Sequence, residues 1–342
     1  MRIALDAMGG DDSPRIEVEG AIQAAALSGT EIILVGDENR IKNELKKYNN
    51  SYTLPLTVMN AKEVITMNEL PAMAVRKKRD SSIVVAVRLV KEGEADAVVS
   101  AGSTGAVMTA CLFELGRLKG INRPAIATIM PTLTGHSVLL DVGANVDCRA
   151  SNLLEFGIMG DVYTRYILKK KDPRIGLLSV GEEGSKGNEL IKEAYAFFEK
   201  GPFNFIGNVE GREIVNGKAD VVVCDGFIGN VVLKFGESVA EMILTLLKQE
   251  FTKGFLSKLG VMFLRPALNN FRKRIDYSEY GGAPLLGIDG DCIICHGSSS
   301  SKAIMNALRV ARDFSEQKVN DHIRESLSSV TEYIGKNAIG QS

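Results

Sequence analysis

Short runs of almost wholly apolar residues alternate with helical segments along most of the chain, and this alternation limits the possible folds more than any other feature. Ile32–Val35 and Val221–Cys224, for example, contain no charged or hydroxyl side chain. Strands that are apolar on both faces are typical of a parallel sheet covered by helices. The alternation of the two patterns therefore predicts a layered α/β fold.

The predicted strands share this apolar or β-branched character, and the predicted helices repeat apolar residues at helical spacing. The strands are Arg2–Met8, Glu31–Val35, Leu56–Asn60, Ala97–Ala101, Ala125–Met130, Ser137–Val142, Arg174–Val180, Phe203–Val209, Ala219–Cys224 and Cys292–Cys295. The helices between them include Ile16–Leu27, Ser81–Lys91, Thr104–Leu118 and Leu190–Glu199.

The size and charge of the chain narrow its class. Its 342 residues suffice for one α/β catalytic domain, 1–342, with room for two lobes. The formal net charge of −1 gives no overall field that would favour nucleic acid. The first ten residues are predicted to form a strand and a turn rather than a signal peptide. The five scattered cysteines give no disulfide framework, so we expect a cytoplasmic protein.

One segment departs from the alternation. From about Gly236 to Ile275 no strand is predicted, and Val239, Met242 and Leu246 recur at helical spacing. We expect a protruding amphipathic helical hairpin, 237–275, inserted into the domain. Its apolar tip includes Leu256, Leu259, Val261, Met262, Phe263 and Leu264.

The hairpin is also basic. Between Lys248 and Arg274 seven basic side chains face one acid, a local net charge of about +6. A basic flank with an apolar face suits an anionic membrane surface, or an acidic protein that carries a lipid. A dimer interface with a solvated rim is an alternative, and it is compatible with an outward-pointing tip.

Glycine and small polar residues follow many of the predicted strands. In parallel α/β sheets, ligands collect at the carboxyl ends of the strands. The candidate loops are Asp6–Asp11, Ser100–Gly105, Asp141–Asn145, Gly181–Asn188, Cys224–Asn230 and His296–Ser299.

The turn Gly102-Ser103-Thr104-Gly105 is the best candidate for anion binding. Its glycines let the backbone approach a ligand, and the free N–H groups at a helix start favour negative charge. An ordinary N-cap turn is the alternative, because Ser and Thr are common caps. Lys186, Asn188 and Asn230 at the ends of other strands, taken as parallel, favour a phosphate site.

The sequence lacks the motifs of several other enzyme classes. There is no G-x-G-x-x-G after the first strand, no G-x-x-x-x-G-K-[ST] loop and no G-x-S-x-G elbow. Cys292-Ile-Ile-Cys295-His296 matches a haem-attachment pattern, but it reads as a buried strand whose two cysteines point to opposite faces. We therefore predict no metal and no cofactor.

Few side chains are candidates for acid–base work. His296 follows a strand among glycine and serines, so it is the strongest of the three histidines, with a loop-bracing role as its alternative. Asp6, Asp141 and Asp225 could each act as a base or as a hydrogen-bond acceptor that braces a loop.

Taken together, these motifs resemble the PlsX family of phosphate acyltransferases. The matching stretches run in order through nearly the whole chain: Asp6–Asp11 with Pro14, Ser100–Gly105, Arg123–Ile126, Asp141–Asn145, Gly181–Asn188, Gly207–Gly211, Asp220–Asn230, Tyr280–Gly287 and His296–Ser299. Several are long and chemically unusual, which makes chance similarity improbable.

The resemblance implies a three-layer α/β sandwich with a mostly parallel sheet, like that of phosphotransacetylases and isocitrate dehydrogenases. It implies a homodimer associated peripherally with the inner face of the cell membrane. It further implies long-chain acyl-carrier protein as donor, inorganic phosphate as acceptor, and delivery of the acyl phosphate to a membrane glycerol-3-phosphate acyltransferase for phospholipid synthesis.

Direct transfer to phosphate fits these residues. We expect Gly102–Gly105 and Asn188 to bind phosphate with help from Lys186, Asn230 and His296 to serve the oxyanion or the leaving group, and Asp225 to orient or deprotonate. The remaining loop residues expected at the active site are Asp6, Gly9, Gly10, Asn145 and Ser298. Arg272–Arg274 or Lys77–Arg79 are candidates for docking the acidic carrier.

Three other functions compete. A short-chain phosphotransacylase that uses acyl-coenzyme A shares the expected fold, but it leaves the basic hairpin without a task. A dehydrogenase of the isocitrate type would need a nicotinamide cofactor. A membrane scaffold without activity would leave the polar strand ends unexplained.

Overall fold

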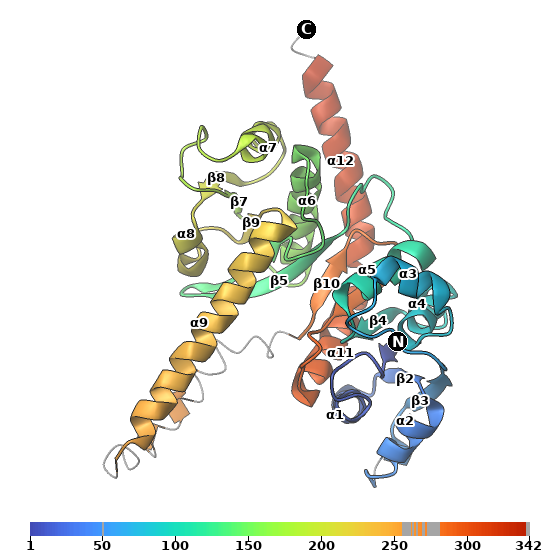
Figure 1. Ribbon diagram of the computed structural model, residues 1–342. Coiled ribbons are helices and arrows are strands. Elements are labelled where there is room, and N and C mark those ends of the chain that lie inside the picture. The colour runs from blue at the N-terminus through green and yellow to red at the C-terminus, as the bar shows by residue number, and fades with distance from the viewer. Residues whose placement is uncertain are drawn as a thin grey trace.

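The protein is described by a computed structural model that covers residues 1–49, 51–254, 261, 263–264, 266–268, 271 and 281–339, with side chains up to residue 330 (Figure 1). The strands are β1 (Arg2–Asp6), β2 (Glu31–Gly36), β3 (Leu56–Asn60), β4 (Ala97–Ser100), β5 (Ala125–Thr132), β6 (Gly135–Leu140), β7 (Ile175–Leu178), β8 (Phe205–Val209), β9 (Val221–Val223), β10 (Ala283–Leu286) and β11 (Asp291–Ile294). The helices are α1 (Arg15–Ser28), α2 (Glu38–Leu45), α3 (Pro71–Lys77), α4 (Ser82–Lys91), α5 (Thr104–Glu114), α6 (Ala150–Tyr166), α7 (Glu189–Glu199), α8 (Gly211–Asn216), α9 (Gly226–Thr252), α11 (Ser301–Glu316) and α12 (Val319–Ile339).

The predicted α/β fold is confirmed, and each of the ten predicted strands is present within a few residues of its expected bounds. The helix predicted to reach Leu118 ends at Glu114. β10 was not predicted, because it is four residues long, contains Pro284 and is defined only by its pairing with β11 and β5.

The described strands form one eleven-stranded sheet in the order β3-β2-β1-β4-β11-β10-β5-β6-β9-β7-β8. β3, β2, β1, β4 and β11 pair in parallel, and so do β6, β9, β7 and β8. Between these two parallel blocks, β10 and β5 make three successive antiparallel pairings. Three reversals mean that the two blocks run in opposite directions.

This reversal contradicts the expectation that the predicted strand ends lie together at one edge of the sheet. Lys186, Asn188 and Asn230 follow strands of the second block, whereas Gly102–Gly105 follows a strand of the first. The sheet therefore does not bring these residues to one shared edge. Any approach between them must come from the connecting loops, from helices, or from a second subunit.

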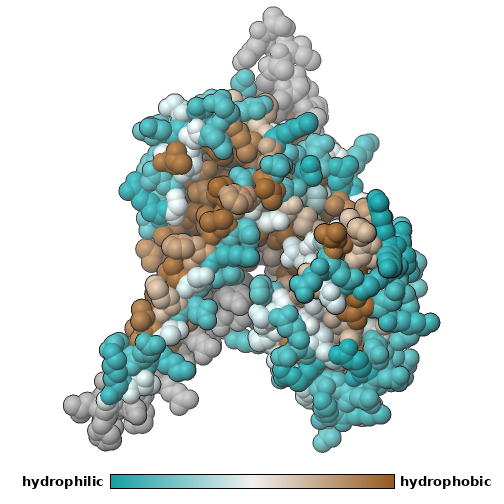
Figure 2. All heavy atoms as spheres, viewed as in Figure 1, coloured by the Kyte–Doolittle hydropathy of each residue, from teal (hydrophilic) through white to brown (hydrophobic). Residues whose placement is uncertain are grey.

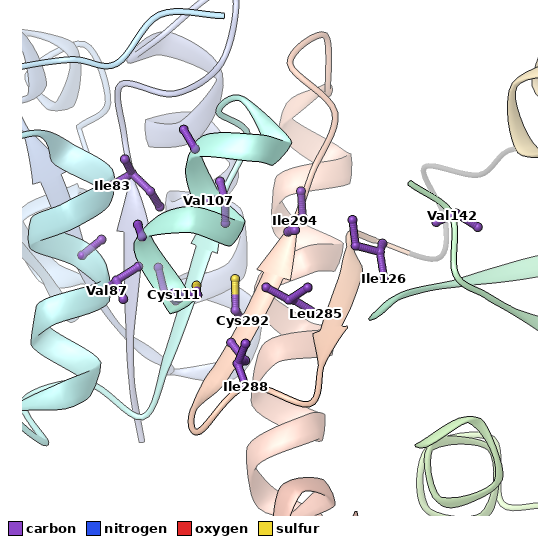
Figure 3. Close-up of a cluster of buried hydrophobic side chains, with 14 of the residues drawn as sticks. Ile83, Val87, Val107, Cys111, Ile126, Val142, Leu285, Ile288, Cys292 and Ile294 are labelled. Carbon is purple, nitrogen blue, oxygen red and sulfur yellow. The ribbon is translucent and has the colours of Figure 1, made fainter. Parts of the chain in front are cut away.

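The core lies on both faces of the sheet, as a three-layer sandwich requires. Along β1, Ala4 packs with α4 and α5 on one face, and Ile3 and Leu5 pack with α1 and α11 on the other. Cys292 and Cys295 divide in the same way, as predicted for residues three apart on a strand. Figure 3 shows Cys292 beside Cys111 in the first of these clusters.

The protruding helix begins earlier than expected. α9 starts at Gly226, directly after β9, and continues for 27 residues, so the predicted boundary at residue 237 lies inside one helix. Figure 1 shows α9 extending away from the sheet. Of the predicted tip, Phe263 and Leu264 are exposed and Val261 is half-buried, whereas Leu256, Leu259 and Met262 lie outside the described residues. Within the described part of the chain, no helix has the length and hydropathy of a membrane span.

Candidate active site

Three loops of the first parallel block lie against one another. They follow β1, β4 and β11, and we call Asp6–Asp11, Ser100–Gly105 and His296–Ser298 the first loop cluster. A Cβ on Gly9 would lie only 2.6 Å from the backbone nitrogen of Gly102, so the two backbones meet without an intervening side chain. The Asp11 N–H donates to the carbonyl of Gly297 at 2.9 Å, which joins the third loop to the first.

Asp6 holds this cluster from below. It is buried, and it accepts hydrogen bonds from the Ser100 hydroxyl at 2.7 Å, from the Met8 N–H at 3.1 Å and from the Ser82 hydroxyl. The Ser100 oxygen in turn accepts from the Gly102 N–H at 3.0 Å. Burial raises the pKa of Asp6 in spite of these donors. Of the two roles predicted for Asp6, this geometry supports bracing.

The start of α5 is open to a ligand. Ser103 stands at its N-cap, yet the Ser103 side chain makes no capping hydrogen bond, and Thr104 is exposed. By contrast, Asn188, Asp225 and Ser300 cap α7, α9 and α11 with their own side-chain oxygens. Within the described chain, α5 therefore keeps unsatisfied N–H groups at its start, together with the hydroxyls of Ser103 and Thr104, which is the arrangement that favours an anion.

His296 stands exposed at the end of β11. Its Nδ1 lies 2.8 Å from the hydroxyl oxygen of Ser298, and the Ser298 N–H donates to the same nitrogen at 3.3 Å. These contacts fix the ring through Nδ1. The Nε2 atom has no hydrogen bond to the rest of the described chain, so it is available to a substrate.

The second loop cluster, Asp141–Asn145 with Cys224–Asn230, follows β6 and β9. Asp141 accepts from the N–H groups of Ile126, Gly143, Ala144 and Asn145 and from the Asn145 amide. Burial raises the pKa of this carboxyl. Asn145 is buried and also donates to a backbone carbonyl, so both polar side chains are used inside the protein.

The loop Gly181–Asn188 follows β7 in the same block. Lys186 is exposed and forms no ion pair within the described chain, so its ammonium group is free to meet a phosphate. Asn188 uses its carboxamide oxygen to cap α7 and keeps only its amide nitrogen for a ligand. Close to this loop, the Ser179 hydroxyl and the Asn208 carboxamide oxygen are buried without a hydrogen-bond partner in the described chain.

α9 leads from the second cluster toward the first, and two of its residues, Lys234 and Glu237, were not predicted from the sequence. Asn230, Lys234 and Glu237 are spaced by four and three residues, so they share one helix face. Asn230 contacts the position where Gly143 would carry a side chain, in the second cluster. Burial raises the pKa of the half-buried Glu237, and electrostatic interactions with His296 of the first cluster and with Lys234 lower it. Helical spacing from Asn230 was the signal that could have identified both residues.

Glu17 was also missed. It is buried below the first cluster, where its Oε1 accepts from the Ser13 hydroxyl at 2.7 Å and from the Gly10 N–H at 3.2 Å. Its Oε2 has no partner within the described chain. Burial raises the pKa of Glu17 to about 7.

The cysteines are unsuited to covalent catalysis. Burial raises the pKa of Cys148 and of Cys295 to about 12, and that of Cys224 well above its usual range. A hydrogen bond with Cys111 and burial do the same for Cys292. The thiolate is the nucleophilic form, so these side chains remain inert thiols at neutral pH. The described residues also contain no group of three or more metal-ligating side chains.

Known proteins similar to this chain identify its family. A family profile described as "Fatty acid synthesis protein" matches residues 1–322. The chain is 53% identical over 330 residues to the phosphate acyltransferase of Pelotomaculum thermopropionicum, covering 96% of each protein, and 55% identical over 327 residues to that of Geotalea uraniireducens, covering 96% and 94%. The chain belongs to the PlsX family of phosphate acyltransferases. It is therefore an acyltransferase, as the resemblance implied.

Solved structures extend the comparison at the level of the fold. A phosphotransacetylase from Streptococcus pyogenes superposes with a TM-score of 0.60 at 19% identity, covering 92% of this chain and 94% of that one. A branched-chain phosphotransacylase from Enterococcus faecalis gives a TM-score of 0.57 at 15% identity, covering 92% and 99%. These values confirm the predicted phosphotransacetylase-like fold of the acyltransferase.

Proposed function

We propose that this acyltransferase moves a long-chain fatty acyl group from acyl-carrier protein to inorganic phosphate. The observation that carries the proposal is the start of α5, where the N-cap Ser103 makes no capping hydrogen bond and follows Gly102, whose backbone meets Gly9. The acyl phosphate would pass to a membrane glycerol-3-phosphate acyltransferase and enter phospholipid synthesis. Membership of the phosphate acyltransferase family supports phosphate as the acceptor.

The transfer needs no covalent enzyme intermediate. An oxygen of hydrogen phosphate attacks the thioester carbonyl carbon, a tetrahedral oxyanion forms, and the C–S bond then breaks. The proton of hydrogen phosphate passes to the departing thiolate, which leaves acyl phosphate and carrier thiol. The protein must hold the two reactants together and stabilise the oxyanion. The raised pKa values of Cys148, Cys224 and Cys295 support this direct route over an acyl-cysteine.

Each predicted catalytic residue receives one task in this scheme. Gly102–Gly105 holds phosphate at the start of α5, and His296 offers Nε2 to the oxyanion or the leaving thiolate. Asn230 and Lys186 belong to the second parallel block. Asn230 would offer its side-chain amide to the oxyanion, and Lys186 would offer its ammonium group to phosphate. Asp225 orients the start of α9, because its carboxylate accepts a capping hydrogen bond from the N–H of Ile228 at 2.9 Å.

A second subunit is part of this proposal. α9 exposes large apolar side chains on the face beside its polar stripe: Ile228, Val231, Phe235, Met242, Ile243 and Leu246. Figure 2 shows apolar surface along α9 and over the part of the protein that adjoins it. Pairing of this face with its copy would give the expected homodimer, and a neighbouring apolar groove would take the acyl chain.

The same helix leads toward the membrane. Phe263 and Leu264, beyond the end of α9, are exposed in a segment rich in basic residues. We expect this tip to bind the anionic inner face of the cell membrane peripherally, which would place the product near a membrane acyltransferase.

One assay tests the proposed reaction. Purified protein is incubated with long-chain acyl-carrier protein and phosphate, and the acyl phosphate is trapped with hydroxylamine. The proposal requires hydroxamate that depends on both phosphate and enzyme. Carrier thioester that stays intact under these conditions would refute it.

A short-chain phosphotransacylase that uses acyl-coenzyme A is the second candidate, and the fold it shares with phosphotransacetylases favours it. The same assay with acetyl- or butyryl-coenzyme A distinguishes the two. Faster turnover with the coenzyme A thioesters than with the long-chain carrier thioester would favour this second function.

A further inference from the structure

The N-terminal end of α3 forms part of the rim of the first loop cluster. The Cγ atom of Pro71 lies 2.7 Å from the position where a Cβ on Gly105 would stand, and the Cε atom of Met67 lies 2.8 Å from the corresponding position on Gly297. The segment from Met67 to Pro71 therefore touches two loops of the cluster. Whatever binds on the outer face of α3 lies next to the entrance of the proposed phosphate site.

The outer face of α3 is apolar and unusually exposed. Leu70 is 70% exposed and Met73 is 68% exposed, and they are three residues apart on one side of the helix. Ala74 and Val75 occupy the buried side. Phe113 of the neighbouring α5 is also exposed, and the Arg76 guanidinium lies over its ring at 5.2 Å from the centroid. In Figure 1 α3 lies beside α5, and Figure 2 shows apolar side chains among polar ones in this part of the lobe.

Positive charge borders these apolar side chains, and no described carboxylate neutralises it. Arg76 and Lys77 are exposed and make no ion pair with a described carboxylate. Their neighbours differ, because Lys78 binds Glu69 at 2.8 Å and Arg79 binds Glu114 at 2.8 Å. Of the basic run predicted to dock the carrier, only Lys77 is thus free, and Arg76 joins it. Arg272–Arg274, the other predicted docking cluster, lies outside the described residues.

We propose that Leu70, Met73, Arg76, Lys77 and Phe113, which we call the α3 surface, dock the acyl-carrier protein. The carrier is acidic, and an acidic helix with a few apolar side chains would match two free cations around an apolar centre. Docking here places the carrier at the rim of the first loop cluster, where its thioester arm has to enter. The proposal rests on acyl-carrier protein being the donor, as proposed above.

The test compares two donors of the same acyl chain, acyl-carrier protein and acyl-pantetheine, which lacks the carrier. In Met73→Glu and in the double variant Arg76→Glu/Lys77→Glu, we expect the KM for acyl-carrier protein to rise about tenfold. The kinetic constants for acyl-pantetheine and the KM for phosphate should stay at wild-type values. Raising the salt concentration should increase the wild-type KM for the carrier more than that of the double variant.

Two controls make the same kinds of substitution elsewhere, one at an exposed apolar residue and one at a single exposed cation. Leu27, 76% exposed at the end of α1, gives Leu27→Glu as a control for Met73→Glu. Lys46→Glu after α2 reverses an exposed charge away from α3. Both should behave as wild type with either donor. Thermal unfolding of every variant checks that the fold is intact.

The outcomes separate the two proposals. Wild-type enzyme that cannot use acyl-carrier protein overturns the proposed donor. Wild-type enzyme that uses the carrier while the α3 variants keep its KM overturns the docking surface alone. Equal losses with both donors would also overturn it, because the change would then act on the active site. Binding of wild type but not of the α3 variants to anionic phospholipid vesicles, with an unchanged KM for the carrier, would assign the surface to a membrane instead.

Discussion

The two loop clusters are built from the same kinds of residue and use them in opposite ways. In the second cluster, Asp141 and Asn145 are buried and their polar atoms bond to neighbouring backbone and to each other. In the first, the buried carboxylates of Asp6 and Glu17 brace the loops, while Thr104 and His296 are exposed and the half-buried Ser103 makes no capping hydrogen bond. A buried, fully bonded aspartate fixes a backbone, whereas unsatisfied donors at a helix start are free to bind substrate. The first cluster is therefore the candidate site for phosphate binding.

The largest expected effect tests the structural role of Asp141. Asp141→Ala leaves five donors of the second cluster without their acceptor, so we expect a loss of about 4 kcal/mol in the free energy of unfolding, or failure to fold. Urea denaturation measures the loss. Asp141→Asn keeps one acceptor oxygen and should lose about half as much. A stable Asp141→Ala protein with abolished turnover would instead make Asp141 a catalytic residue.

The next effect tests the chemical role of the first cluster. The double variant Ser103→Ala/Thr104→Ala removes two hydroxyls from the start of α5, and we expect kcat/KM for phosphate to fall about 100- to 1,000-fold. The free energy of unfolding should change little, because the Ser103 side chain makes no capping hydrogen bond. Wild-type kinetics in this variant would exclude the two hydroxyls from the site.

A pH-dependent effect separates Glu17 from the residues that bind substrate. Its pKa is about 7 in the folded protein against an ordinary 4.5, so between these values the folded state holds a proton that the unfolded state has lost. Stability from this group is complete below pH 4.5 and is lost as the pH rises through 7. The loss is at most about 3.5 kcal/mol, because each pKa unit corresponds to about 1.4 kcal/mol.

Glu17→Gln cannot ionise and removes this slope. Between pH 5 and pH 8, the free energy of unfolding of wild type should therefore fall by about 2.5 kcal/mol more than that of the variant. Denaturation curves of both proteins at the two pH values give the difference. A constant difference would show that Glu17 has the same proton affinity folded and unfolded.

The smallest predicted effect concerns His296. His296→Ala removes Nε2 from the first cluster, and we expect kcat to fall about 10- to 100-fold with the KM for phosphate nearly unchanged. His296→Gln, which can still donate a hydrogen bond, should recover part of the rate. A large rise in the KM for phosphate without a change in kcat would make His296 a phosphate ligand.

Local sequence pattern predicted most of the strands, whereas features that depend on pairing between distant segments were not predicted. The strands were identified because residues such as Ile32–Val35 are apolar on both faces. β10 was not predicted, because its four residues are recognisable as a strand only from their pairing with β11 and with β5, which lies more than a hundred residues away in the chain. The same antiparallel pairings reverse the second block, so sequence could not show that Lys186 and Gly102 leave opposite edges of the sheet.

The candidate site shows the same division. Ser103, Thr104 and His296 were predicted from their loops, and the structure leaves their polar groups open. Glu237 was not predicted, because only the path of α9 in the folded chain places it within electrostatic range of His296. Whether an aspartate braces or reacts depends on its donors, and those come from several loops at once, as around Asp141.

A crystal structure of the enzyme with bound phosphate tests the central claim most directly. We expect phosphate at the start of α5, within hydrogen-bond distance of the Ser103 hydroxyl and of the Thr104 and Gly105 N–H groups. Phosphate bound in the Gly181–Asn188 loop or in the second loop cluster, with the start of α5 empty, would contradict it.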